Sequence, residues 1–157
     1  MAIIMDGKAL SAKIRTQIRE QSAQLEAETG IKPGLAVIIV GEDPASKIYV
    51  RNKAKACEEV GFKSEVYELP EKTTEDELLD LVKVLNSRSD IHGILVQSPL
   101  PSHLDEALIV NNISPEKDVD AFHPENVGRI MIGDYSFLPC TPAGVMEFLK
   151  EYGIETR

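Results

Sequence analysis

The chain has 157 residues, of which 43% are hydrophobic and 27% charged, a balance typical of one soluble domain with its own core. The 17 basic and 26 acidic residues give a net charge of −9, which argues against a nucleic-acid or anionic-membrane partner, and no apolar run reaches the roughly 18 residues that span a bilayer. The N-terminus lacks the features of a signal peptide, and two cysteines offer no disulfide framework, so we expect a cytoplasmic protein.

The first two predicted elements are a helix and a buried strand. We expect the helix to run from Asp6 or Gly7 to about Glu28, because apolar residues recur along one stripe of that segment. The continuous apolar run 35–40 has strand length and predicts a strand covered on both faces.

The next predicted element is a helix over residues 44–60, and one of its lysines breaks the pattern. Asp43 and Pro44 are a good cap and first-turn pair for this helix. At about 100° per residue, its apolar residues and Tyr49 gather on one side, and Lys53 lands among them. Burial disfavours the charged form of a lysine, so a partly buried one can act as a base. The alternative is that Lys53 buries only its stem and extends its ammonium to solvent.

The rest of the chain continues the alternation of strands and helices. The pattern predicts strands over 63–69 and 91–96, helices over 74–86, 105–111 and 142–152, and a loop over 114–128. Thr74 and Glu77 stand in the register of a capping box. Such alternation implies an α/β domain with a mostly parallel sheet flanked by helices, in which ligands bind beyond the carboxyl ends of the strands. The loops after Val40 and Val96 lie at such ends.

Several motifs that mark nucleotide and hydrolase sites do not occur in the sequence. These are GxGxxG, GxxxxGK[ST], GxSxG and HExxH. The three histidines show no pairing typical of zinc, so we expect no metal site. Tyr49 and Lys53, spaced by four on one helical face, match the YxxxK pair of short-chain dehydrogenases, but the glycine-rich turn that should precede this pair is missing.

Polar residues follow the second buried strand. Gln97 ends that strand and either reaches a neighbouring site or bonds loop backbone. Asp118 and Asp120 in PEKDVDAF face the same way if the segment is extended. A carboxylate is a good acceptor for the paired N–H and NH₂ edge of a pterin or guanine ring, although acidic loop residues also serve as caps or stay solvated. Cys140 in PCTP is interpreted as a buried structural thiol.

Together these segments resemble the bifunctional methylenetetrahydrofolate dehydrogenase/methenyltetrahydrofolate cyclohydrolase family of folate one-carbon metabolism. The matching stretches are DGKALSAKI, VGEDPASKIYVRNKAKACEEVG, GILVQSPLP, PEKDVDAF and PCTPAG, so the likeness covers essentially the whole chain. It implies a three-layer, aminoacid dehydrogenase-like N-terminal domain, with 1–157 as the folate-binding catalytic domain. The implied activity is NADP-dependent (NAD in some members) oxidation of 5,10-methylenetetrahydrofolate to the methenyl form, followed by hydrolysis to 10-formyltetrahydrofolate.

The same resemblance assigns roles to four residues. It implies that Lys53 is the catalytic general base or proton relay and that Gln97 contacts and tunes it. It implies that Tyr49 packs on and hydrogen-bonds the folate and that Asp120 holds the pterin edge. The remaining substrate-binding positions, mainly through their backbone, are Val96, Ser98 and Leu100.

Two departures and one missing part qualify this resemblance. The family usually has leucine and glycine where this chain has Ser98 and Ala121, and we expect both changes to affect folate affinity. Family members continue into a Rossmann domain that binds the nicotinamide cofactor, and we expect that domain to be missing from this chain. The resemblance also implies a homodimer that serves purine, histidine and methionine biosynthesis. The alternative function is a non-catalytic folate-binding module or a degenerate paralogue.

Overall fold

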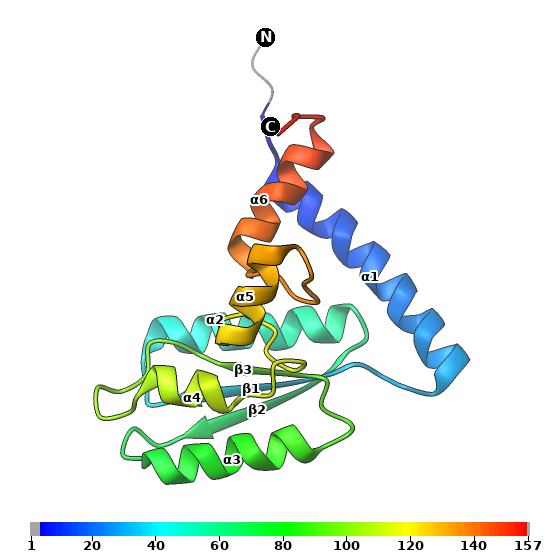
Figure 1. The fold of residues 1–157 in the computed structure, drawn as a ribbon. Coiled ribbons are helices and arrows are strands. Elements are labelled where there is room, and N and C mark those ends of the chain that lie inside the picture. The colour runs from blue at the N-terminus through cyan, green and yellow to red at the C-terminus, as the bar shows by residue number, and fades with distance from the viewer. Residues whose placement is uncertain (1–3, 157) are drawn as a thin grey trace.

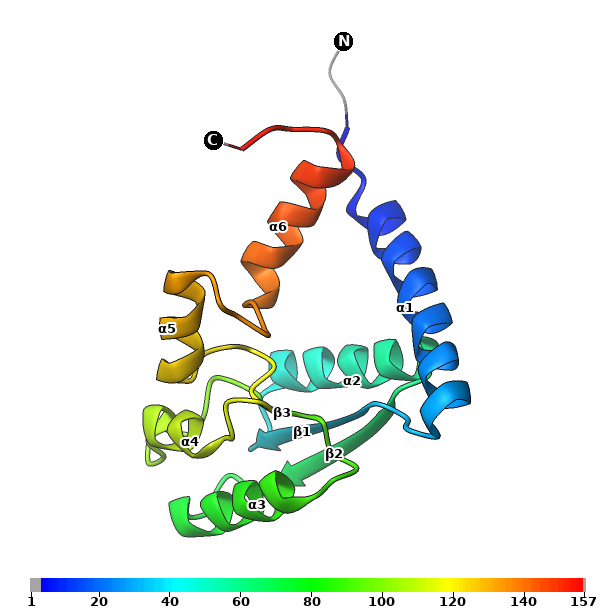
Figure 2. The ribbon, with the colours of Figure 1, turned by 45° about the vertical axis from the view of Figure 1, so that its right-hand side comes forward.

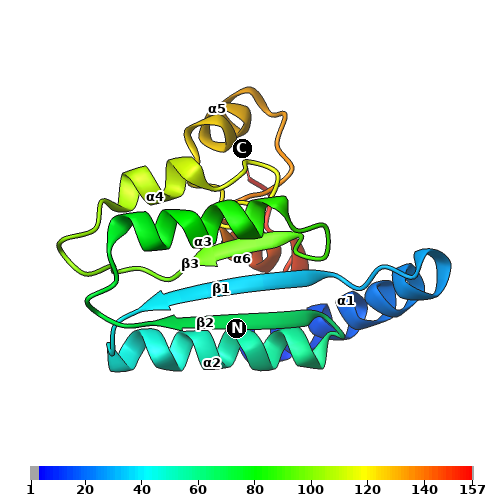
Figure 3. The ribbon, with the colours of Figure 1, turned by 90° about the horizontal axis from the view of Figure 1, so that it is seen from below.

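The computed structural model describes residues 4–156, which form an α/β domain with a parallel sheet. The strands are β1 (Gly34–Val40), β2 (Lys63–Leu69) and β3 (Gly93–Val96), and the helices are α1 (Gly7–Thr29), α2 (Pro44–Glu59), α3 (Glu75–Ser87), α4 (Glu106–Asn112), α5 (Pro124–Ile132) and α6 (Cys140–Glu151). The sheet order is β2-β1-β3, with β1 in the centre. Helices α3 and α4 cover one face of the sheet and α2 covers the other (Figure 3). The predicted three-layer fold is therefore confirmed.

The central strand β1 explains why both faces of the sheet are buried. Its residues pair in parallel with residues 63–69 of β2 and residues 93–96 of β3. Because successive side chains of a strand point to opposite faces, Ile38 packs in the larger core beneath α3 and α4, whereas Val37 and Ile39 pack with Val50 of α2. A strand buried on both faces needs the continuous apolar run that the sequence shows.

The predicted helix ends follow from local side-chain caps. The Asp43 carboxylate accepts a hydrogen bond from the backbone N–H of Ser46 at 2.7 Å, and Pro44 occupies the first turn of α2. Thr74 and Glu77 form the predicted capping box of α3. These caps satisfy backbone N–H groups that have no partner within the helix.

One predicted loop contains a helix. Residues 114–128 were predicted as a loop, but α5 begins within them at Pro124, with His123 as its cap and Gly133 (φ 78°) at its C-terminal end. The proline at the first turn and the glycine after the end are ordinary helix signals. The prediction was wrong because histidine is not among the preferred capping residues, although the His123 side chain here accepts a hydrogen bond from the N–H of Glu125 at 3.1 Å.

Helices α1 and α6 extend away from the sheet and converge at the ends where the chain begins and finishes (Figures 1 and 2). The backbone N–H of Asp6 donates to the Tyr152 hydroxyl at 2.8 Å, and Lys13 pairs with Glu151 at 2.6 Å. Cys140, the first residue of α6, is exposed, so its interpretation as a buried thiol was wrong. The reason is that α6 packs beside α1 and buries none of its residues fully. None of the helices within residues 4–156 combines the length and apolarity needed to cross a membrane.

Candidate active site

Helix α2 presents Lys53 on its buried stripe. Ser46, Val50 and Cys57 of this helix are buried, and Lys53 falls between Val50 and Cys57 with the same spacing of three and four residues. Its side chain is half-buried. Tyr49, which the pattern placed on the same side, is 61% exposed. Tyr49 lies one turn before Lys53, at the border between the buried and solvent faces.

The end of β3 meets Lys53. The backbone N–H of Gln97 donates to the carbonyl of Ile38 at 2.8 Å, which extends the parallel pairing by one residue and fixes where the Gln97 side chain starts. From there, Gln97 Oε1 accepts a hydrogen bond from Lys53 Nζ at 3.0 Å. Gln97 Nε2 donates to the backbone carbonyl of Ser98 at 2.7 Å. The side chain therefore both reaches its neighbour and bonds the loop, which were the two alternatives left open by the sequence.

The loop after α4 is anchored by Lys117 and Asp118. The Lys117 ammonium donates to the carbonyls of Asn86 and Arg88 at 2.7 Å each, at the C-terminal end of α3, where the helix dipole favours a positive charge. The Asp118 carboxylate is 2% exposed and accepts from the His123 N–H at 2.8 Å and from Asn126 Nδ2 at 2.9 Å. Two members of the PEKDVDAF motif are thus explained by structure alone.

Asp120 is the half-buried member of the motif whose carboxylate has no hydrogen-bond partner among the described residues, whereas Glu116, whose carboxylate also has none there, is exposed. The backbone turns after Asp118 instead of staying extended, so the two aspartates have different surroundings. Burial raises the pKa of Asp120, the nearby Lys53 ammonium opposes that rise, and the Asp118 carboxylate adds to it. A half-buried carboxylate without donors is costly to the fold, and such groups concentrate at binding sites.

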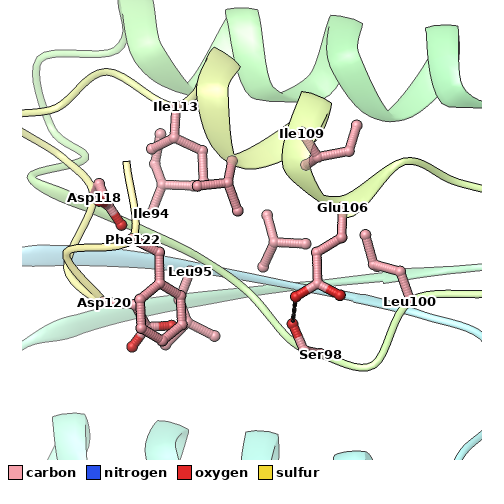
Figure 4. A pocket seen from close by; sticks show the side chains of 12 residues that line it. Ile94, Leu95, Ser98, Leu100, Glu106, Ile109, Ile113, Asp118, Asp120 and Phe122 are labelled. Carbon is pink, nitrogen blue, oxygen red and sulfur yellow. Dashed lines mark hydrogen bonds between the residues drawn. The ribbon is translucent and has the colours of Figure 1, made fainter. Parts of the chain in front are cut away.

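A small pocket opens beside Asp120, between the end of β3, α4 and the loop before α5 (Figure 4). Its floor is apolar, and Asp120 and Phe122 lie opposite Ser98 and Glu106. Phe122 is 56% exposed at the pocket. The predicted substrate-binding residues that line it are Val96, Ser98, Leu100 and Asp120. Lys53, Gln97 and Tyr49 are not part of this lining, although Lys53 acts on Asp120 through its charge.

The sequence did not single out Glu106 and Phe122, which also line the pocket. Glu106 is the first residue of α4, and the Ser98 hydroxyl donates to its Oε1 at 2.5 Å. An acidic residue in the first turn of a helix has an ordinary electrostatic explanation, so no sequence signal marked it.

Two small residues let the loop approach the sheet, and one of them is strained. A side chain at Gly93 of β3 would meet Val119 Cγ1 at 2.5 Å, so the segment that carries Asp120 needs glycine there. Ala121 is fully buried with a φ of 56°. This left-handed conformation costs an alanine roughly 1–2 kcal/mol, which is the physical reason that glycine suits the position.

The described residues do not fit the pyrophosphate of a dinucleotide. Such a group is held by free N–H groups at a helix N-terminus after a glycine-rich turn. Here the side chains of Asp43, Thr74 and Asp105 already accept hydrogen bonds from the N-termini of α2, α3 and α4. Helix α6 has no side-chain cap, but Pro139 precedes it and not a glycine-rich turn. Within residues 4–156 there is also no cluster of three or more metal-ligating side chains.

Residues 5–120 match the family described as tetrahydrofolate dehydrogenase/cyclohydrolase, catalytic domain. The chain belongs to this family. It is 57% identical over 155 residues to the bifunctional protein FolD of Geotalea daltonii, covering 99% of this chain and 55% of that protein. It is 52% identical over 157 residues to FolD of Prosthecochloris aestuarii, covering 99% of this chain and 53% of that protein. The chain therefore spans about half the length of these curated relatives.

Solved structures of this family share the fold. The bifunctional FolD methylenetetrahydrofolate dehydrogenase/cyclohydrolase of Campylobacter jejuni is similar with a TM-score of 0.94 at 54% identity, over 97% of this chain and 54% of that one. The Trypanosoma brucei FolD complexed with NADP cofactor and inhibitor is similar with a TM-score of 0.93 at 39% identity, over 98% of this chain and 53% of that one.

Proposed function

We propose that this chain is the folate-binding catalytic part of a methylenetetrahydrofolate dehydrogenase/methenyltetrahydrofolate cyclohydrolase, with Lys53 as general base or proton relay. One observation carries the proposal. The half-buried Lys53 bonds Gln97 at 3.0 Å beside Asp120, a carboxylate without a hydrogen-bond partner among the described residues. A base, a partner that orients it and a hydrogen-bond acceptor for the pterin ring are the three groups needed to hydrolyse the one-carbon bridge of a bound folate.

The hydrolytic step follows from this arrangement. Methenyltetrahydrofolate is an amidinium-like cation, and the oxygen of a water molecule attacks its bridging carbon. Lys53, in its neutral amine form, accepts the proton that the water loses. The hydroxyl of the resulting adduct then loses its proton as its oxygen becomes the formyl carbonyl, the bond from that carbon to N5 breaks, and N5 takes up a proton. Asp120 holds the N–H and NH₂ edge of the pterin through charge-assisted hydrogen bonds, and Gln97 orients the lysine. Tyr49 offers its exposed ring to the remainder of the folate.

Hydride transfer needs a second participant. NADP supplies the hydride acceptor when bound, as the name of the Trypanosoma brucei structure suggests for that protein. The described residues of this chain do not fit its pyrophosphate, so we derive no step through it. We expect the residues that bind it in the part of the curated relatives that this chain does not match.

The wider setting is part of the same proposal. We expect the active protein to be a cytoplasmic homodimer. Its product is a one-carbon donor for purine, histidine and methionine biosynthesis. Size measurement of the purified chain, alone and with folate, tests the oligomeric state.

The proposal is tested by adding 5,10-methenyltetrahydrofolate to the purified chain and following the loss of its absorbance. Turnover above the rate without protein is the expected result. The assay is repeated with the part of the Campylobacter jejuni enzyme that this chain does not match, supplied separately. Folate binding without turnover in both conditions would favour a non-catalytic folate-binding module, and absence of both binding and turnover would refute the proposal.

A further inference from the structure

The direction of the Gln97 amide decides what Lys53 meets. A glutamine amide carries an acceptor oxygen and a donor NH₂ on opposite sides. Gln97 Oε1 accepts from Lys53 at 3.0 Å, and its Nε2 donates to the Ser98 carbonyl at 2.7 Å. If the amide were reversed, its NH₂ would face the lysine ammonium and its oxygen would face a carbonyl. The position of the Ser98 carbonyl therefore selects the orientation that suits Lys53.

The Ser98 carbonyl belongs to an exposed loop and needs support of its own. The Ser98 hydroxyl donates to Glu106 Oε1 at 2.5 Å, and Figure 4 shows this bond across the pocket wall. The Glu106 side chain of α4 therefore bonds Ser98, and the backbone carbonyl of Ser98 in turn accepts a hydrogen bond from Gln97.

Glu106 is itself on a fixed support. The Asp105 side chain caps α4 through the N–H of Leu108 at 3.1 Å, and the N–H of Asp105 donates to Glu75 of α3 at 2.9 Å. Ile109, one turn further along α4, is fully buried in the main core. The Glu106 carboxylate is exposed and makes no other hydrogen bond among the described residues, so the core does not require it.

We propose that Glu106 is a positioning residue for Lys53, acting through the Ser98 hydroxyl and the Gln97 amide. The chain of contacts runs from α4 to the end of β3 and on to α2, and it joins one wall of the pocket to the base. This inference rests on the proposed function, because it assigns Lys53 the role of base.

The kinetic test compares variants that break the Ser98–Glu106 bond with variants that keep it. Ser98→Ala and Glu106→Ala each lower kcat for methenyltetrahydrofolate hydrolysis about fivefold, the factor for one net hydrogen bond, with little change in KM. The double variant is no worse than either single one, because both remove the same bond. Glu106→Gln keeps an acceptor for the Ser98 hydroxyl and is expected to recover most of the kcat that Glu106→Ala loses. Additive losses, or no loss in the alanine variants, would overturn the proposal.

A matched control separates this contact from a general effect of charge. Glu71, after β2, is exposed and makes no side-chain hydrogen bond among the described residues. Glu71→Gln is expected to keep wild-type kcat. A fivefold loss in Glu71→Gln would show that any carboxylate near this end of the sheet has the same effect, and it would contradict the proposal.

A spectroscopic test does not depend on activity. In ¹⁵N-labelled chain, the Gln97 side-chain amide is assigned by comparison with Gln97→Met. Glu106→Ala shifts that NH₂ resonance and speeds its hydrogen exchange, whereas Glu106→Gln leaves both unchanged. A chain that binds no folate but shows this pattern contradicts the proposed function and supports the contact. An unchanged Gln97 amide in a folded Glu106→Ala variant refutes the positioning role.

Discussion

Replacement of Lys53 by methionine tests the proposed base directly. Methionine keeps most of the apolar stem of the half-buried side chain but removes the ammonium that bonds Gln97 Oε1 at 3.0 Å. Loss of a general base lowers a rate roughly 10²–10⁴-fold, which corresponds to about 3–5 kcal/mol of transition-state stabilisation. We therefore expect Lys53→Met to abolish measurable hydrolysis of methenyltetrahydrofolate.

The fold should tolerate the same change. The variant loses one hydrogen bond, with a net value of about 1 kcal/mol, and it no longer desolvates an ammonium. The free energy of unfolding is then expected to change by less than about 1.5 kcal/mol, and Tm by less than about 5 °C. The Lys53 charge also opposes the raised pKa of Asp120, so its removal moves the Asp120 titration to still higher pH.

The assay combines absorbance loss of methenyltetrahydrofolate, thermal unfolding and ¹³C NMR titration of Asp120. Lys55→Met is the matched control, because Lys55 lies on the exposed side of the same helix and makes no hydrogen bond among the described residues. Lys55→Met is expected to keep wild-type activity. Near-normal turnover by a folded Lys53→Met variant would refute the reasoning.

Two further predictions concern carboxylates with opposite pKa shifts. Asp120→Asn weakens folate binding at least tenfold, the loss expected when a charge-assisted contact becomes neutral. Because burial raises the pKa of Asp120, its charged form destabilises the fold above that pKa. Calorimetry should therefore find Asp120→Asn at least as stable as wild type at pH 7. The difference in stability should vanish as acid protonates Asp120. Glu65 has a strongly lowered pKa, chiefly through its hydrogen bonds from Arg88. Its contribution to the stability of the fold is therefore present above its unfolded pKa and is lost as the pH falls below about 4. Glu65→Gln should flatten that acid-induced fall in Tm, whereas Glu68→Gln, an exposed neighbour, should not.

Most of the fold was predictable because its signals are local. The capping box of Thr74 and Glu77, the cap at Asp43 and the continuous apolar run of β1 each specify an element within a few residues. Strand β3 begins at Gly93, two residues later than the pattern indicated, because Ile91 is buried before the ladder with β1 starts. The family was also predictable, since it depends on ordered motifs and not on contacts.

The candidate site was less predictable, because its residues gain their roles from elements far apart in the chain. The pattern drew attention to Lys53 as a polar interruption of a buried stripe. It offered no way to separate Asp118 from Asp120, which have the same chemistry and stand two residues apart. Only the contacts of Asp118 with Asn126 and His123 show that one carboxylate is used by the fold while the other is not.

The order of apolar and polar residues therefore determined the helices, the strands and the layered arrangement, since burial periodicity and capping act over short stretches of chain. The tertiary structure alone decided that Cys140 is exposed and that Glu106 accepts a hydrogen bond from Ser98, in the loop beside Gln97. The physical reason is that a hydrogen bond depends on position within tenths of an ångström, and packing between distant segments sets those positions.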